Sequence, residues 1–582
     1  MKRHLTQSRT GVLAIILLGM MAIFVMRLFY LQIIKHSEYV SLAQASQQRH
    51  FVIPAERGKL YMMDGGAPAP VVLNQTVYTV IADPQTVKQE QRQQIIAALQ
   101  EIAGGEVVSD VAKRLERTTS RYEVLARNIT RTQAEKLKAK DFVGILYQKG
   151  SIRNYPEGQL AAQVLGFVNA EGKGQYGVEG ALNDRLKGRD GLLKTVADVR
   201  NVPLTLSKDN VRVEAKSGEN VALSIDRNVQ SYAEEALKRG IDKAGATEGS
   251  VMVMNPNSGQ VLAMANYPTY NPVEYAKQKD AAIFSNATTM LPFEPGSIVK
   301  TFSMATGIDK GVVTPQSTYS NTDCTEVGDR KICNALRGLG GTTSMQSAFN
   351  NSLNVGMITI ARRLGDGSTI TPGARQTLYE YYHEKFGFGE ATGIELAEAP
   401  GLLYAPNRPG AEVNYANITF GQGMNATMVQ AASAFCSVVN GGQYFRPTVV
   451  AGTVDANGGL RSSAASLLRR TISEQSSATM RGMLSTARAV LNQRMPDKDK
   501  PGYDVGGKTG TSETLINGSY TMDETVATYI GYGGANRPEY VIMVRVAAPG
   551  KRKNLQGNIH AAPIFTDISN WMIDYMKLAP KG

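Results

Sequence analysis

The sequence predicts an α+β protein with a single N-terminal transmembrane helix, and three observations lead to this prediction. An apolar run occupies residues 11–34, near the start of the 582-residue chain. Segments with strand character open and close the region 216–582, and helical patterning fills the stretch between them. Strands at both ends of a helical region indicate an antiparallel sheet that is packed by helices.

The transmembrane prediction rests on the first 34 residues. Residues 1–10 form a short tail with basic side chains, and the apolar run 11–34 is interrupted by Arg27. A run of about 24 residues is long enough to cross a bilayer as one helix. Basic residues before the span place the N-terminus in the cytoplasm and the remaining chain outside it. A cleaved signal peptide is the alternative, and it is disfavoured because its apolar core is shorter than this run.

The composition limits the kinds of partner. A formal net charge of +12 suits attraction to anionic membrane or wall polymers, and it equally suits a plain solvated surface. No arginine–aromatic platform, zinc spacing or recognition-helix pattern accompanies this charge, so we expect no nucleic-acid partner. The chain has 5 His, and they form no cluster of ligands in the sequence, so we expect no metal and no cofactor.

The three cysteines fall into two groups. Cys324 and Cys333 flank a short polar stretch, and outside the membrane either a disulfide or two free thiols fits this spacing. Cys436 lies in an apolar helical run, which predicts a place in the core.

Residues 35–215 differ in their pattern of polar and apolar residues from the rest of the chain. We expect a strand at 76–82 and amphipathic helices at 85–102 and 132–139. We expect turns at 166–169 and 177–180. No pair of candidate catalytic groups occurs in this region. It is therefore interpreted as an elongated, non-catalytic pedestal or contact domain, which ends at a polar boundary over 205–219.

Residues 216–582 carry the elements of the predicted sheet. The segments 249–255 and 260–267 predict a hairpin, since Pro-Asn-Ser-Gly joins them. The other expected elements are a helical block over 297–364, a helix within 427–439, strands at 505–510, 525–533 and 539–548, and a closing helix over 563–578. The late strands would then complete the sheet that the early hairpin begins.

A candidate nucleophile lies at Ser297, at the start of the expected helical block. Lys300 follows three residues later, so both side chains lie on one face of a helix. A serine hydroxyl becomes a good nucleophile when a neighbouring base takes its proton, and lysine is such a base only as the neutral amine. Burial and a second cation nearby would both lower the lysine pKa. A lone Ser-x-x-Lys is a weak signal, equally typical of a capped surface helix.

Two companion motifs follow Ser297 in order. Ser352-Leu353-Asn354 comes first, and Lys508-Thr509-Gly510-Thr511 comes later in the chain. Ser-x-x-Lys and Ser-x-Asn each occur once, whereas a second Lys-Ser-Gly at 216–218 precedes Ser297 and is out of order. The three motifs in this order are typical of penicillin-binding proteins and serine β-lactamases, and together they are much more specific than any one alone.

With these motifs and several further strings, the chain resembles the class B (monofunctional) penicillin-binding proteins. These are membrane-anchored peptidoglycan D,D-transpeptidases of the septal and elongation types. The further strings are Arg57-Gly58, Arg153-Asn154-Tyr155-Pro156, Gly259-Gln260-Val261-Leu262-Ala263-Met264 and Phe420-Gly421-Gln422-Gly423. The resemblance implies a pedestal of the dimerisation type over 35–215 and a penicillin-binding transpeptidase domain over 216–582. One departure is Leu353, where many members have Ser or Asp, and that side chain need not face the site.

The resemblance also implies roles for the motif residues. Ser297 would attack the penultimate D-Ala carbonyl of a stem pentapeptide and release the terminal D-Ala, while Lys300 takes the hydroxyl proton. Ser352 would relay a proton to or from the leaving group, with Lys508 nearby. Asn354 would hold the substrate amide and Lys300 in place.

The remaining roles concern substrate binding. Lys508 and Thr509 would bind the substrate carboxylate, and the backbone N–H groups of Ser297 and Thr511 would form the oxyanion hole. We expect glycine at Gly510 because a side chain there would block the approach of the substrate peptide. The amine of a second stem peptide would resolve the acyl-enzyme, and β-lactams would acylate the same serine.

The expected partners are peptidoglycan stem peptides, β-lactams, the cytoplasmic membrane, and a glycan polymerase or other wall-synthesis protein on the pedestal. Two alternatives stay open: a hydrolase of the D,D-carboxypeptidase or β-lactamase type, and a β-lactam sensor or inactive scaffold. A Glu-x-x-Leu-Asn string, as in β-lactamases that hydrolyse their acyl-enzyme, occurs at 179–183. It precedes Ser297 and is interpreted as a coincidence.

Overall fold

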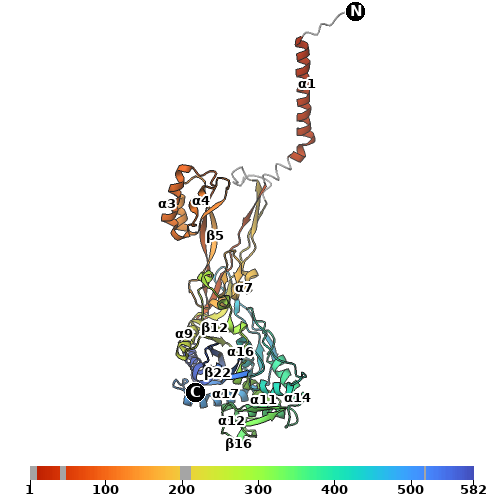
Figure 1. Ribbon diagram of the computed structural model, residues 1–582, viewed down its shortest axis with the longest axis vertical. Coiled ribbons are helices and arrows are strands. Elements are labelled where there is room, and N and C mark those ends of the chain that lie inside the picture. The colour runs from red at the N-terminus through yellow and green to blue at the C-terminus, as the bar shows by residue number, and fades with distance from the viewer. Residues whose placement is uncertain (1–8, 40–47, 197–210, 517–518, 582) are drawn as a thin grey trace, which may run out of the picture. The chain divides into compact units, whose positions relative to one another are not determined.

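The computed structural model describes residues 9–39, 48–196, 211–516 and 519–581 (Figure 1). These residues divide into two compact units. The smaller unit comprises the chain up to Arg57 together with Lys187–Gly218, and the larger one comprises Gly58–Leu186 and Glu219–Gly582.

The smaller unit contains the predicted transmembrane segment. Helix α1 (Arg9–Phe29) continues into a short π-helix (Tyr30–Ile34). Gly11–Ile34 is the one helical stretch among the described residues that is long and apolar enough to cross a membrane, with a mean hydropathy of 2.6. None of its most apolar window is buried, and its length and composition agree with the predicted anchor. The same unit holds an antiparallel sheet of β1 (Gln48–Ile53), β8 (Gly191–Val196) and β9 (Val211–Val213).

A seven-stranded sheet of order β19-β18-β10-β2-β3-β4, with β5 also paired to β3, joins four strands of the predicted pedestal region to three strands of the region 216–582. Its strands are β2 (Leu60–Asp64), β3 (Ala67–Ala82), β4 (Glu123–Thr130), β5 (Ile145–Asn154), β10 (Val221–Asp226), β18 (Val450–Val454) and β19 (Leu460–Ser462). Helices α3 (Arg92–Ala103), α4 (Val111–Leu115) and α5 (Arg131–Lys138) bury apolar side chains against β3 and β4. Both amphipathic helices and the strand predicted here are present.

Two predictions of secondary structure were wrong, one before Ser297 in the chain and one after it. The expected turn at 177–180 is part of a short helix, α7 (Gly177–Ala181). The expected helical block over 297–364 is interrupted by two hairpins, β13–β16 and β14–β15. These hairpin strands are Thr318–Asn321 (β13), Cys324–Val327 (β14), Arg330–Cys333 (β15) and Gly341–Ser344 (β16), which are short and largely polar, so they lack the apolar alternation that reveals a strand. Part of the predicted boundary over 205–219 lies outside the described residues.

The region 216–582 has the expected antiparallel sheet, of order β12-β11-β23-β22-β21. The strands are β11 (Glu248–Met254), β12 (Val261–Tyr267), β21 (Asp504–Ile516), β22 (Ser519–Gly534) and β23 (Pro538–Ala547). The predicted early hairpin and all three late strands are confirmed. Strand β11 from the start of the region pairs with β23 from its end, so the sheet is complete only when both strands are present.

Helices cover both faces of this sheet (Figure 1). Val251 and Val253 of β11 pack towards α9 (Arg227–Ala244) and α18 (Ala562–Tyr575). Met252 and Met254 belong to the core on the opposite face, which α11 (Lys300–Asp309), α13 (Asn354–Arg363), α16 (Met428–Val439) and α17 (Glu474–Arg494) complete. The other helices of this region are α10 (Ala287–Met290), α12 (Met345–Asn350), α14 (Pro372–Tyr379) and α15 (Ala411–Ile418). Cys436 is buried in α16, as predicted.

Candidate active site

Ser297 lies in a 3-10 turn, η6 (Gly296–Val299), that leads directly into α11. Gly296 has φ +63, a left-handed conformation that glycine adopts without strain. The Ser297 side chain is partly exposed, whereas Lys300, one turn later, is fully buried. The predicted placement of the two residues on one helical segment is therefore confirmed, although its first turn is 3-10 rather than α-helical.

Lys300 is surrounded by acceptors from the second motif. Its Nζ donates to the backbone oxygen of Ser352 at 2.5 Å and to Asn354 Oδ1 at 2.7 Å, and it lies 3.1 Å from Ser352 Oγ. Ser352 has φ +55, which is uncommon for a residue with a side chain, and it presents both oxygens to the lysine. The side chain of Leu353 is buried in the core, as its departure from the usual motif allows.

Lys508 approaches the same serine from strand β21. Its Nζ donates to Ser352 Oγ at 3.0 Å and to the backbone oxygen of Thr509 at 3.2 Å. The Ser352 hydroxyl is thus shared by two buried lysines, one from each flanking motif. Within the described part of the chain, no hydrogen bond joins the Ser297 hydroxyl to either lysine.

Burial decides the charge states of these lysines. Burial, and then the positive charge of Lys508, hold the pKa of Lys300 well below its ordinary value. Burial alone lowers the pKa of Lys508, to about 7. A neutral Lys300 can donate two N–H groups to Ser352 O and Asn354 Oδ1 and keep a lone pair to accept a proton. The site therefore favours a neutral Lys300 beside a lysine that is charged below neutral pH.

Packing gives Gly510 a second reason to be glycine, besides the expected one. A Cβ at this position would overlap Thr528 Oγ1 and would lie 2.9 Å from Pro295 O and 3.0 Å from Ile298 Cγ2. The missing side chain therefore lets β21 pack on the turn that carries Ser297. The expectation that it keeps a path open for substrate has no direct support in this packing.

The remaining residues of the third motif lie at the exposed edge of the sheet. Thr509 and Thr511 pair with Tyr529 and Ala527 of β22 on one side of β21, and β21 has no further strand on its other side among the described residues. Gly557 N donates to Thr511 Oγ1 at 3.2 Å. The free edge of β21 beside Ser297 is suitable for pairing with an extended peptide.

The first match with known proteins covers residues 249–570 and has the description "Penicillin binding protein transpeptidase domain". This match spans more than half of the chain. The chain belongs to the penicillin-binding protein transpeptidase family. A second match, "Penicillin-binding Protein dimerisation domain", covers residues 52–223.

Relatives of this penicillin-binding protein match it over nearly its whole length. It is 27% identical to the stage V sporulation protein D of Bacillus subtilis, over 98% of this chain and 87% of the relative. It is also 27% identical to the probable peptidoglycan D,D-transpeptidase PenA of Neisseria meningitidis, over 100% of this chain and 95% of that one.

Solved structures share the fold of this penicillin-binding protein. Penicillin-binding protein 2X from Streptococcus thermophilus superposes with a TM-score of 0.73 at 23% identity, covering 91% of this chain and 80% of that one. Penicillin-binding protein 3 from Mycobacterium tuberculosis, solved in complex with aztreonam, gives 0.67 at 24% identity, over 91% and 98%.

Sequence reasoning missed the residues that hold the Ser297 turn. Gly296 N donates to Gly421 O at 3.1 Å, and a Cβ on Gly421 would overlap the Gly296 carbonyl. Glu294 accepts from Gly423 N at 2.9 Å through Oε1, and its backbone oxygen accepts from the Ser512 hydroxyl. The Phe-Gly-Gln-Gly string was the available signal for this contact, since two glycines in one short string indicate close backbone approach.

The open question about Cys324 and Cys333 is settled by a disulfide between them. The bond closes the β14–β15 hairpin, in which the two cysteines face each other in register. Cys333 O accepts from Asn354 Nδ2 at 2.9 Å, so the hairpin contacts a residue of the site directly.

Proposed function

We propose that this chain is a membrane-anchored peptidoglycan D,D-transpeptidase of the class B penicillin-binding proteins, active in cell wall synthesis for division or elongation. The relatives named as probable peptidoglycan D,D-transpeptidases and the match to the transpeptidase domain support this function. The observation that carries it is the buried Lys300, one turn from a partly exposed serine and bonded to Ser352 and Asn354. The domains proposed are a tail over 1–10, an anchor over 11–34, a pedestal over 35–215 and a transpeptidase domain over 216–582.

Acylation is the first step of the proposed reaction. Ser297 Oγ attacks the carbonyl carbon of the penultimate D-Ala, and its proton passes to the neutral amine of Lys300. The backbone N–H groups of Ser297 and Thr511 stabilise the oxyanion of the tetrahedral intermediate. When the peptide C–N bond breaks, the leaving D-Ala amine takes a proton through the Ser352 hydroxyl, which touches both lysines.

Substrate binding uses the outer edge of the sheet. The substrate peptide pairs with the free edge of β21, and its terminal carboxylate binds the Lys508 ammonium and the Thr509 hydroxyl. Because a carboxylate favours the charged form of a neighbouring amine, bound substrate keeps Lys508 protonated above the pH at which the free site would lose that proton.

Deacylation completes the cross-link. The amine of a second stem peptide attacks the Ser297 ester carbonyl and gives up a proton to the neutral amine of Lys300. The ester C–O bond then breaks, and the serine oxygen recovers that proton from Lys300. A β-lactam follows the first step only, since its leaving amine stays tethered to the acyl group and the ester persists.

The alternative is a hydrolase of the D,D-carboxypeptidase or β-lactamase type, in which water takes the place of the second amine. The one Glu-x-x-Leu-Asn string in the sequence offers no base for that water. Glu179 is completely buried in α7, where it forms an ion pair with Arg153 at 2.8 Å. A β-lactam sensor or inactive scaffold is disfavoured because all three motifs converge on one hydroxyl.

The anchor and the pedestal suggest where this enzyme works. We place the N-terminus in the cytoplasm and the catalytic domain outside, because basic residues precede the span. We assign to the pedestal a glycan polymerase or another wall-synthesis protein as partner. Substitution of Arg57 that leaves Ser297 acylation intact tests this assignment, and unchanged complex formation would contradict it.

The function is tested by mass spectrometry of the protein after incubation with benzylpenicillin, beside Ser297→Ala. A transpeptidase gives an adduct on Ser297 that lasts for many minutes and is absent from the variant. Rapid turnover of the drug without a lasting adduct would assign the protein to the hydrolases. Folded protein that is not acylated at all would point to the scaffold.

A further inference from the structure

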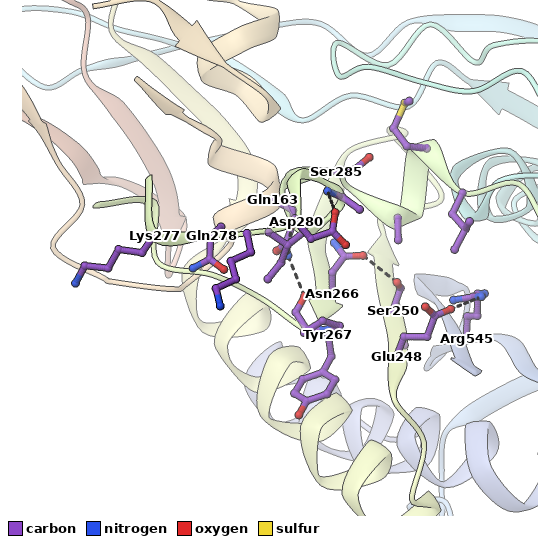
Figure 2. A pocket seen from close by; sticks show the side chains of 18 residues that line it. Gln163, Glu248, Ser250, Asn266, Tyr267, Lys277, Gln278, Asp280, Ser285 and Arg545 are labelled. Atoms are coloured by element: carbon purple, nitrogen blue, oxygen red, sulfur yellow. Dashed lines mark hydrogen bonds and ion pairs between the residues drawn. The ribbon is translucent and has the colours of Figure 1, made fainter. Parts of the chain in front are cut away.

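A large cavity lies at the opposite edge of the transpeptidase sheet from the active site (Figure 2). Its volume is about 860 Å³, which is within the usual range of small-molecule sites. Its floor is formed by the ends of β11, β12 and β23, and its other wall by the segment from Lys277 to Leu291. None of the motif residues of the active site lines it.

A row of directly opposed residues runs across the sheet from the active-site edge to this cavity. Gly510, Thr528, Arg545, Ser250 and Asn266 are direct neighbours across the five strands. Directly opposed residues of antiparallel strands point to the same face of a sheet. At one end of the row, Thr528 Oγ1 donates to Pro295 O at 3.3 Å, beneath the Ser297 turn. At the other end, Ser250 Oγ donates to Asn266 Oδ1 at 2.8 Å in the cavity floor.

The chemistry of the cavity suits an uncharged ligand. Arg545 and Glu248 form an ion pair at 2.7 Å and cancel each other's charge, and Lys277 is paired with Glu274 at the opposite side of the view in Figure 2. Lys279 and Asp280 are adjacent and of opposite sign. The lining is predominantly apolar, with contributions from Ile283, Ala287, Met290 and Leu291.

The Arg545 guanidinium in the cavity can make a specific polar contact with a ligand. The Arg545 side chain is 8% exposed, and its single hydrogen bond among the described residues runs from Nη2 to Glu248 Oε1. A guanidinium carries five N–H donors, so donors remain for a ligand carbonyl. Glu248, which is 31% exposed, can accept from a ligand N–H. A donor and an acceptor side by side are the complement of an amide group.

We infer that this cavity binds a neutral, largely apolar amide and that its occupation changes the rate at which Ser297 is acylated. Coupling is provided by the chain that leaves the cavity wall. Met290 and Leu291 are followed by Phe293, whose backbone pairs with Ala426 at 3.1 and 3.0 Å and whose ring lies 5.4 Å from the Arg545 guanidinium. Displacement of the wall is therefore transmitted to the start of the Ser297 turn. This role goes beyond the proposed transpeptidation and uses none of its catalytic groups.

Binding is tested without any reference to activity. The full chain in detergent micelles is labelled with ¹³C in its methionine methyl groups, and the Met290 signal is assigned by its loss in Met290→Leu. N-acetyl-leucine methylamide is the neutral probe, and N-acetyl-leucine is its charged counterpart. We expect a saturable shift of the Met290 methyl with the amide, and at least tenfold weaker binding of the acid. Equal binding of both would overturn the assignment of ligand class, and no saturable shift would overturn the site.

Two neighbouring alanines provide a matched pair of variants. Ala282 lines the cavity, whereas Ala281 does not, and both are exposed in the same 3-10 helix (Ala281–Phe284). Ala282→Trp should weaken amide binding at least tenfold, and Ala281→Trp should leave it unchanged. Equal effects of both substitutions would show that the probe binds elsewhere.

Coupling is measured as the acylation rate with a fluorescent penicillin. Saturating amide should change this rate at least twofold in the parent and in Ala281→Trp, and should have no effect in Ala282→Trp. Because coupling between two sites is reciprocal, the acylated protein should bind the amide with an affinity that differs from that of the free protein. Binding at Met290 with no change in acylation would remove the regulatory role, and absence of acylation in every sample would instead count against the proposed transpeptidase.

Discussion

Asn354 Nδ2 donates to the backbone oxygen of Cys333 at 2.9 Å, while Asn354 Oδ1 accepts from Lys300. The orientation of the asparagine amide is therefore fixed by the hairpin that the Cys324–Cys333 disulfide closes. A second contact joins the next residue of each segment, since Asn334 Oδ1 accepts from Val355 N at 2.9 Å. It supports the same arrangement of the hairpin against α13.

We predict that opening this disulfide slows the acylation of Ser297. The double variant Cys324→Ser/Cys333→Ser should be acylated by benzylpenicillin about tenfold more slowly, because loss of one positioning hydrogen bond costs about 1 kcal/mol or more. Acylation rates followed by mass spectrometry provide the measurement. A reductant should slow the parent by a similar factor and should not affect the double variant, and a parent indifferent to reductant would contradict the prediction.

The two lysines predict a bell-shaped pH profile for acylation. At low pH, Lys300 gains a proton and stops acting as a base, so the second-order rate constant falls on the acid side. As pH rises through about 7, Lys508 loses the charge that binds the carboxylate in the proposed reaction, so the rate constant should fall on the alkaline side. Stopped-flow measurement of the acylation rate constant between about pH 5 and 9 covers both the acid and the alkaline limb of the profile.

Lys508→Arg is the control for the alkaline limb. A guanidinium stays charged throughout this pH range, so the alkaline fall should disappear while the acid limb stays in place. An unchanged alkaline limb in this variant would assign the limb to another group.

Substitution of Gly510 by alanine should abolish most acylation. The added Cβ would push β21 away from Pro295 and Ile298, and a shift of about 1 Å in a catalytic site costs on the order of 100-fold in rate. Gly482→Ala is the matched control, because a Cβ there meets nothing within 4 Å and the residue lies inside α17. That variant should keep full activity and gain about 0.5–1 kcal/mol of stability. If Gly510→Ala retained the parent rate, the packing explanation would be wrong.

The buried pair of Arg488 and Asp499 predicts a strong stability effect. Arg488 is 1% exposed, and its Nε and Nη2 donate to Asp499 at 2.8 and 2.6 Å. Arg488→Met leaves a buried carboxylate without its partner and should cost about 3–5 kcal/mol. Arg488→Met/Asp499→Leu removes both charges and should recover most of this loss. Thermal unfolding measures both, and a double variant as unstable as the single one would refute this explanation.

Sequence reasoning succeeded where chemistry or burial leaves a regular trace. The strands around Val251 and Val544 are buried on both faces, and such strands are nearly continuous apolar runs. The three motifs were found because each carries its reactive groups within a few residues. Their convergence on the Ser352 hydroxyl was available only through the family resemblance, since Lys300 and Lys508 are 52 and 156 residues away from it.

Other features could not be read from the sequence, each for a physical reason. The second reason for glycine at Gly510 lies in Pro295 and Thr528, which no local pattern connects to it. The state of Cys324 could not be decided because spacing is equally compatible with a bond and with free thiols. The strands β13–β16 were missed because their stability comes from contacts with α12, α13 and the site rather than from apolar alternation.

The pairing of β11 with β23 has a consequence for how the enzyme is made. Synthesis delivers Ser297 well before Lys508, and β11 waits for its partner residues 541–547 of β23. During synthesis, the emerging polypeptide therefore carries Ser297 before Lys508 and the free edge of β21 that complete the folded site. We expect a nascent chain that lacks β21, β22 and β23 to be unreactive towards benzylpenicillin, because the site forms only when the domain folds as a unit.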